Sequence, residues 1–279
     1  MRLILLTSLT MIAFAANSVL NRLAVDSGAI DPSSFAIIRV ASGALALGMV
    51  LTVRGGGFPL FAKGRGIGAV SLATYMIGFS LAYASLDAGL GALILFGTVQ
   101  IAMFAWGAVR GSRPTQRQLA GAGVAFAGLL VALWPSDGFG SLWGAMLMVA
   151  AGLGWAAYTL VGRGADDPLA TTAANFLVAT PLLLILLAGP ALYAAPSGIA
   201  LAMLSGAVTS GLGYALWYAV LPHLAAQSAA VVQLSVPVIA MAGGAALLGE
   251  RVGFDLLAAA VLVLGGIAVA ITGKTRHAA

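Results

Sequence analysis

Residues 88–109 decide the fold: they read AGLGALILFGTVQIAMFAWGAV, without one charged side chain. A helix needs about 20 apolar residues to cross the hydrocarbon core of a bilayer, which is about 30 Å thick. Similar runs flank this one on both sides, and the chain of 279 residues is 61% hydrophobic and only 8% charged. Soluble domains carry roughly 25% charged residues. The sequence therefore predicts an all-α integral membrane protein and excludes a soluble enzyme or a disordered chain.

Charges and turn residues divide the chain into ten apolar segments. We expect membrane-spanning helices at about 3–23, 33–53, 66–86, 88–109, 117–134, 141–161, 169–188, 197–219, 226–248 and 254–272. The first segment stays apolar through Val25, which favours a span over a cleavable signal peptide. Pro32 and Pro168 suit the first turn of the helices that follow them.

Positive charges gather on one side of this ten-helix arrangement. The two termini and the connections on their side hold ten of the 13 Lys and Arg residues, whereas the opposite connections hold only Arg22 and Arg251. Short cytoplasmic loops carry such an excess. We therefore expect a multi-pass protein of a bacterial-type inner membrane with both termini in the cytoplasm.

Two parts of the sequence resemble each other at a separation of 138 residues. Residues 111–133 and 249–271 are identical at eight of 23 positions without a gap, beginning with GSR at 111–113 against GER at 249–251. This agreement predicts two five-helix repeats, 1–137 and 138–279, that form one transport domain. Because five is odd, the second repeat is inverted. Many secondary transporters have this architecture, with a substrate site near the midplane between the halves.

The order of several short motifs resembles the EamA family of the drug/metabolite transporter superfamily. These motifs are Phe14-Ala15-Ala16-Asn17-Ser18 with Arg22, then Pro32, Phe35 and Arg39, then Gly154-Trp155-Ala156-Ala157-Tyr158 with Arg163 and Pro168, and the run from Ala229 through Pro237 to Gly249-Glu250-Arg251. The resemblance spans essentially the whole chain and implies ten helices, cytoplasmic termini and export of metabolites. Within the family the chain looks like the YddG-type aromatic amino-acid exporters. It departs from the pattern at Ser112, where the resemblance implies Glu.

Polar and aromatic side chains inside the segments predict a substrate cavity. Amide and phenol groups in hydrocarbon need partners, so we expect them to face the interior of the bundle. The residues predicted to line the cavity are Asn17, Asn21, Tyr75, Phe79, Tyr83, Phe96, Gln100, Trp155, Tyr158, Tyr214, Trp217, Tyr218, Gln233 and Pro237. Each aromatic residue could equally pack against lipid or lie in an interfacial belt. Pro237 is expected to kink segment 226–248 and to free a backbone carbonyl.

Arg39 is the one charged side chain that lies away from the ends of the predicted segments. It could bind a substrate carboxylate bidentately, snorkel outward or bond helix-terminal carbonyls. No Asp or Glu lies deep in a segment, which favours facilitated transport or weak proton coupling. The chain has no cysteine and no dense basic patch, and we expect no metal, no cofactor and no nucleic-acid partner.

These features predict a carrier that exports amino acids, preferring aromatic and neutral ones, by alternating access through a central cavity. Its expected partners are the lipid bilayer and a neutral or zwitterionic small molecule. The alternative is a drug or nucleoside exporter with proton antiport. A channel has less support, and so does a membrane-embedded enzyme, because the sequence contains no HExxH or GxSxG motif. The sequence leaves open whether the protein is a monomer or a homodimer.

Overall fold

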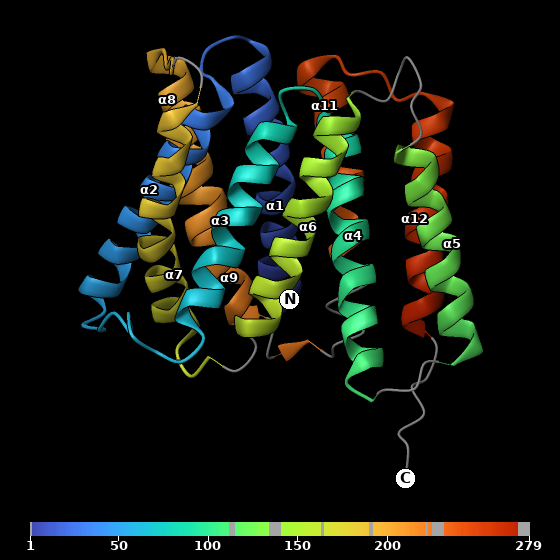
Figure 1. Cartoon of the computed structure of the whole chain (residues 1–279), viewed down its shortest axis with the longest axis horizontal. Helices are drawn as coiled ribbons and strands as arrows, with labels where there is room; N and C mark the ends of the chain where they lie inside the picture. The colour runs from blue at the N-terminus through green and yellow to red at the C-terminus, as the bar shows by residue number, and fades with distance from the viewer. Residues whose placement is uncertain are drawn as a thin grey trace.

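The computed structural model describes residues 2–111, 115–133, 141–162, 165–189, 192–220, 223–224 and 232–272. Every named element in this part of the chain is a helix, and the helices run back and forth across one bundle (Figure 1). Seven of them are long and apolar enough to cross a membrane, and two shorter apolar helices accompany them. These observations support the predicted all-α membrane protein.

The helices follow the predicted segments closely in the first part of the chain. They are α1 (Arg2–Asp26), α2 (Pro32–Val53), α3 (Arg65–Ala82), α4 (Ala88–Val109) and α5 (Gln116–Leu133). The second part contains α6 (Leu142–Gly162), α7 (Pro168–Leu183), η1 (Leu184–Ala188), α8 (Pro196–Leu204), η2 (Ser205–Leu212), α9 (Gly213–Val220), α11 (Ser235–Leu248) and α12 (Phe254–Thr272). We call the side where α1 begins and α12 ends the lower face, and the side where α1 ends the upper face (Figure 1).

Aspartates cap the two helices that begin with Pro32 and Pro168, the prolines that the sequence predicts in the first turns. The Asp31 carboxylate accepts hydrogen bonds from the amides of Ser33 and Ser34 at 2.9 and 3.0 Å, and from the amide of Tyr193 at 2.8 Å. Burial opposes ionisation of Asp31, but these bonds together hold its pKa below the usual value. Asp167 caps α7 through the Ala170 amide at 3.1 Å.

The second half contains local departures from regular α-helix. The predicted segment 197–219 is interrupted by η2, a π-helix over Ser205–Leu212. Such widened turns are rare and often occur at functional sites. A 3₁₀ helix, η1, follows α7 shortly after Pro181. Pro237 does not kink the middle of a helix: a turn at Leu234 precedes α11, so Pro237 lies in its first turn, where the missing amide costs little.

Helices α5 and α12 form a close pair at one edge of the bundle (Figure 1). A β-carbon added at Gly121 would lie 2.5 Å from the Ala270 nitrogen, and one added at Gly266 would lie 2.4 Å from the Ala125 nitrogen. Small residues therefore let these two backbones approach closely, as expected of helices packed in lipid.

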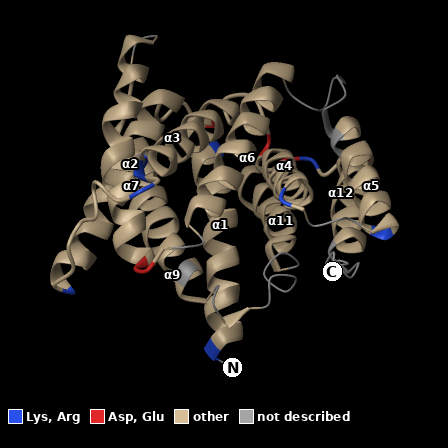
Figure 2. Cartoon of the chain, turned by 60° about the horizontal axis from the view of Figure 1, so that its bottom comes forward, with Lys and Arg blue, Asp and Glu red and all other residues tan. Residues whose placement is uncertain are grey.

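The outer surface of the bundle is largely apolar. Large side chains such as Leu45, Met49, Phe126, Leu153 and Leu247 are exposed there. Charged residues colour only a few places on the ribbon (Figure 2). This distribution matches a protein whose solvent is the bilayer.

Candidate functional site

Aromatic rings from four helices meet at the centre of the bundle. The Phe14 ring lies 5.9 Å from Trp155 and 5.7 Å from Tyr214, and Trp155 lies 4.9 Å from Tyr75 and 4.8 Å from Tyr214. Phe79 packs 5.3 Å from Tyr75. These centroid separations are those of interacting aromatic pairs, so the rings form one continuous wall.

Arg39 of α2 points into this aromatic wall and is fully buried. Its Nη2 donates to the Tyr75 hydroxyl at 3.0 Å and to the Tyr214 hydroxyl at 3.5 Å, and its Nε donates to Ser210 Oγ at 3.0 Å. The guanidinium carbon lies 4.6 Å from the centre of the Phe79 ring, within cation–π range. Arg39 therefore does not snorkel outward; it carries a positive charge into the apolar centre.

One guanidinium nitrogen of Arg39 takes part in none of these hydrogen bonds. Nη1 is buried and has no hydrogen-bond partner among the described residues. None of the four described ion pairs includes Arg39. A buried donor without a partner costs free energy, and a buried charge costs more. This arrangement favours an anionic group beside Nη1, and a carboxylate matches the planar geometry of a guanidinium.

The π-helix η2 positions the neutral hydrogen-bonding groups of the site. Asn17 Oδ1 accepts hydrogen bonds from the hydroxyls of Ser205, Thr209 and Ser210 at 2.9, 2.6 and 3.0 Å. Ser210 thus links Arg39 to Asn17. Because Tyr214 lies in the helix that continues directly from η2, the widened turn sets the reach of this tyrosine as well.

The cavity between these side chains is almost closed. Its free volume is about 10 Å³, which holds no more than about one water molecule. It is lined by Phe14, Asn17, Tyr75, Phe79, Leu95, Phe96, Trp155 and Tyr214. The surrounding helices would have to separate before an organic molecule could bind here.

A charged network closes the bundle at the upper face. Arg22 of α1 donates to the Tyr83 carbonyl at 3.3 Å and forms ion pairs with Asp87 at 3.6 Å and Glu250 at 3.8 Å. Glu250 accepts from the Ala88 amide, at the start of α4, at 2.8 Å. These contacts join α1, α3, α4 and the loop after α11. Burial, helped by the Asp87 charge, raises the pKa of Glu250, while the Ala88 amide and Arg22 oppose the rise.

Residues 142–272 match the EamA-like transporter family. The chain is 47% identical over 280 residues to an uncharacterized protein of Pseudomonas aeruginosa, covering 100% of this chain and 97% of that protein. The chain belongs to the EamA-like transporter family. The family and the relatives named as transporters indicate a transporter rather than an enzyme.

Other relatives of this family member are more distant. It is 26% identical to an uncharacterized transporter of Archaeoglobus fulgidus, over 94% of this chain and 95% of that one. A probable amino-acid metabolite efflux pump of Salmonella typhimurium is 29% identical, over 67% and 69% of the two chains. A protein of known crystal structure shares the fold with a TM-score of 0.64 and 19% identity, covering 94% of this chain and 97% of that one.

The structure brings many of the predicted site residues of this EamA protein together. Asn17, Tyr75, Phe79, Phe96, Trp155 and Tyr214 line the central cavity. Tyr83, Tyr158 and Trp217 are buried and extend the wall, with rings 4.8 Å from Phe79, 5.6 Å from Trp155 and 5.9 Å from Phe14.

The remaining predicted residues lie away from the cavity. Asn21 is buried nearer the upper face and donates to Ser80 Oγ at 3.1 Å. Gln100 is partly buried on α4, and Gln233 and Pro237 are buried at the start of the α11 region. These three are not among the residues that line the described cavity. The side chain of Tyr218 lies outside the described part of the structure, as does Ser112.

Sequence reasoning missed the hydroxyls of η2 and the role of Glu250. Ser205, Thr209 and Ser210 recur at helical spacing in segment 197–219, which was a usable signal. Glu250 lies in a connection, so it did not count as an intramembrane carboxylate. Its side chain is nevertheless only 10% exposed, because the ends of α1 and α4 cover it.

Proposed function

We propose that this EamA protein exports neutral amino acids, with a preference for aromatic and other apolar side chains. The observation that carries the proposal is the unpartnered Nη1 of Arg39, whose guanidinium contacts Tyr75, Tyr214 and Phe79 of the aromatic wall, although Arg39 is not among the residues that line the small closed cavity. The guanidinium would bind the substrate carboxylate, and the rings of Trp155, Tyr75 and Tyr214 would pack against its side chain. The distant relative named as a probable amino-acid metabolite efflux pump supports an amino-acid substrate.

The proposed mechanism is alternating access between two inverted five-helix repeats, 1–137 and 138–279, with both termini cytoplasmic. The cavity of about 10 Å³ cannot hold an amino acid, so the helices around it would open to one face at a time. The Arg22 network would hold the upper face closed while the lower face is open. None of the residues lining the described cavity is acidic, which supports facilitated transport without a coupling ion.

Counterflow in proteoliposomes tests this function. Vesicles are loaded with unlabelled L-phenylalanine, and the uptake of external labelled L-phenylalanine is followed without any ion gradient, against protein-free vesicles. We expect transient accumulation of label that tyrosine and leucine inhibit and that L-phenylalaninol, which lacks the carboxylate, does not. Inhibition by adenosine instead would favour a nucleoside exporter. Accumulation that requires an imposed pH gradient would overturn the uncoupled mechanism.

A further inference from the structure

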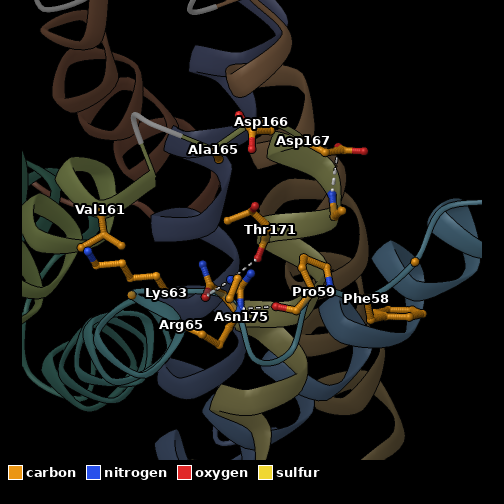
Figure 3. A pocket seen from close by; sticks show the side chains of 14 residues that line it. Phe58, Pro59, Lys63, Arg65, Val161, Ala165, Asp166, Asp167, Thr171 and Asn175 are labelled. Atoms are coloured by element: carbon orange, nitrogen blue, oxygen red, sulfur yellow. Dashed lines mark hydrogen bonds between the residues drawn. The ribbon is translucent and has the colours of Figure 1, made fainter.

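A second cavity opens at the lower face, which we call the vestibule. It lies between the loop from α2 to α3 and the ends of α6 and α7 that face it, and its volume is about 670 Å³ (Figure 3). Small-molecule sites have volumes of about 300–1,000 Å³, so an amino acid fits inside. Its lining includes the polar and charged residues Lys63, Arg65, Asp166, Thr171 and Asn175.

Arg65 lies in the wall of the vestibule with its guanidinium held in place. The residue is only 8% exposed. Its Nε donates to the Pro59 carbonyl at 3.0 Å, and its Nη1 donates to the Thr171 carbonyl at 2.9 Å and to Asn175 Oδ1. Figure 3 shows the head group beside Thr171 and Asn175. Three neutral acceptors thus fix the orientation of this cation before any ligand binds, which reduces the entropic cost of binding.

Arg65 has no carboxylate partner among the described residues. No described ion pair within 4.0 Å includes it, although Asp166 and Asp167 line the same cavity. Asp167 is instead engaged by Arg54 at 3.4 Å. A buried cation without a counter-charge favours an anion beside it. Lys63 lies on the same side of the vestibule as Arg65 and adds to the positive potential (Figure 3).

The charges of the vestibule are separated in a way that matches a zwitterion. In Figure 3, Lys63 and Arg65 lie on one side, and Asp166 and Asp167 lie on the other. A carboxylate beside Arg65 would leave an ammonium group free to face the acidic side. A dianion without a positive group would be attracted by Lys63 and Arg65 but repelled by the two aspartates.

Tyr158 links the helix that lines the vestibule to the central aromatic wall. Tyr158 is 1% exposed, its ring lies 5.6 Å from Trp155, and its hydroxyl donates to Thr172 Oγ1 at 3.4 Å. Thr172 follows Thr171, which lines the vestibule. Tyr158 therefore contacts both α7, whose Thr171 lines the vestibule, and the central wall.

We propose that the vestibule is a second carboxylate-binding site, in which Arg65 holds an amino acid at the lower face while Arg39 serves the central site. The inference rests on the proposed function, because it takes the ligand to be the transported amino acid. It adds a loading position on the lower face and assigns the carboxylate contact there to Arg65.

Equilibrium binding of labelled L-phenylalanine to protein in phosphatidylcholine nanodiscs tests the inference. We expect two molecules per wild-type chain and one per chain in Arg65→Gln, with the lost site weakened by about tenfold to hundredfold, as expected for losing a charged hydrogen bond. Arg39→Gln should lose the other site. Arg65→Lys keeps the positive charge but removes the planar guanidinium group, so it should weaken binding at the vestibule site less than Arg65→Gln does. Arg110→Gln, an arginine of the lower face outside the vestibule, should keep both sites.

Other numbers of bound L-phenylalanine molecules would contradict the second site. Two binding sites in the Arg65→Gln protein would overturn the inference. A single site in the wild type that only Arg39→Gln removes would also overturn it, but this result would leave the proposed function intact. No binding to the wild type would overturn both. Phosphatidylcholine has a phosphate but no net charge, so nanodiscs that also contain phosphatidylglycerol test an anionic lipid headgroup as the ligand of Arg65. Loss of the second site only in those discs would assign Arg65 to lipid and overturn the substrate assignment.

Discussion

Replacing Arg22 with glutamine would open the upper face of the bundle. Arg22 donates to the Tyr83 carbonyl at 3.3 Å and pairs with Glu250 at 3.8 Å, and its side chain is 17% exposed. A hydrogen bond from a charged group is worth about 1.5–3 kcal/mol when it is shielded from water. We therefore expect the closed state to lose about 2 kcal/mol, which increases the open fraction about 30-fold.

Asp26→Asn is the matched control. Asp26 also pairs with Arg22, at 3.0 Å, but its side chain is 55% exposed and the pair lies within one turn of helix. Exposed pairs of this kind contribute about 0.3–0.5 kcal/mol. The control should therefore change the open fraction by no more than about twofold.

The natural chain contains no cysteine, so a single introduced thiol reports opening without background. Ser80 is fully buried one turn below Tyr83, on the path from the upper face to the centre. In the Ser80→Cys protein, the rate of labelling by a membrane-impermeant maleimide added to the upper side should follow the open fraction. Arg22→Gln should raise this rate about 30-fold. A rate within twofold of the parent, in protein that elutes as a folded species, would show that Arg22 does not hold the upper face closed.

The remaining predictions concern pH and packing. Because burial raises the pKa of Glu250 in the closed bundle, protonation favours this state over an open state in which Glu250 is solvated. Opening should therefore decrease on acidification, measured as Ser80→Cys labelling relative to labelling of the same protein with Glu250→Gln at the same pH, which cancels the pH dependence of the thiol. Asp31→Ala should cost about 1 kcal/mol by removing the cap of α2. Because the pKa of Asp31 is lowered, its contribution should be present above about pH 4 and be lost as the pH falls through the folded value, as thermal unfolding at several pH values would show. Gly121→Ala should destabilise the α5–α12 pair by about 1–3 kcal/mol, whereas Gly123→Ala, with open space around it, should not.

Sequence patterning predicted the helices because hydrophobic length alone specifies a membrane span. Charges and Asp-Pro pairs placed the starts of two segments at about 33 and 169, one residue after α2 and α7 begin in the structure. The π-helix η2 was not predicted, because its residues are as apolar as those of an ordinary helix. Its geometry depends on partners across the bundle, such as Asn17.

Part of the site was predicted from the spacing of residues along the helices. Aromatic and amide residues that recur at helical spacing, such as Tyr75 and Phe79, mark a face of a helix, and that face meets the cavity. The burial of Arg65 and Glu250 could not be predicted. Both lie at the ends of segments, where sequence position does not tell a solvated charge from one covered by neighbouring helices.

Binding of the substrate carboxylate by Arg39 inside the aromatic wall is the contact on which the proposed export depends. Its most direct test compares the dissociation constants of L-phenylalanine and L-phenylalaninol for Arg39→Gln and for the parent, each carrying Arg65→Gln so that the vestibule does not contribute. The parent should prefer phenylalanine by about tenfold to hundredfold, and Arg39→Gln should show no preference. An equal preference in both proteins would contradict the claim.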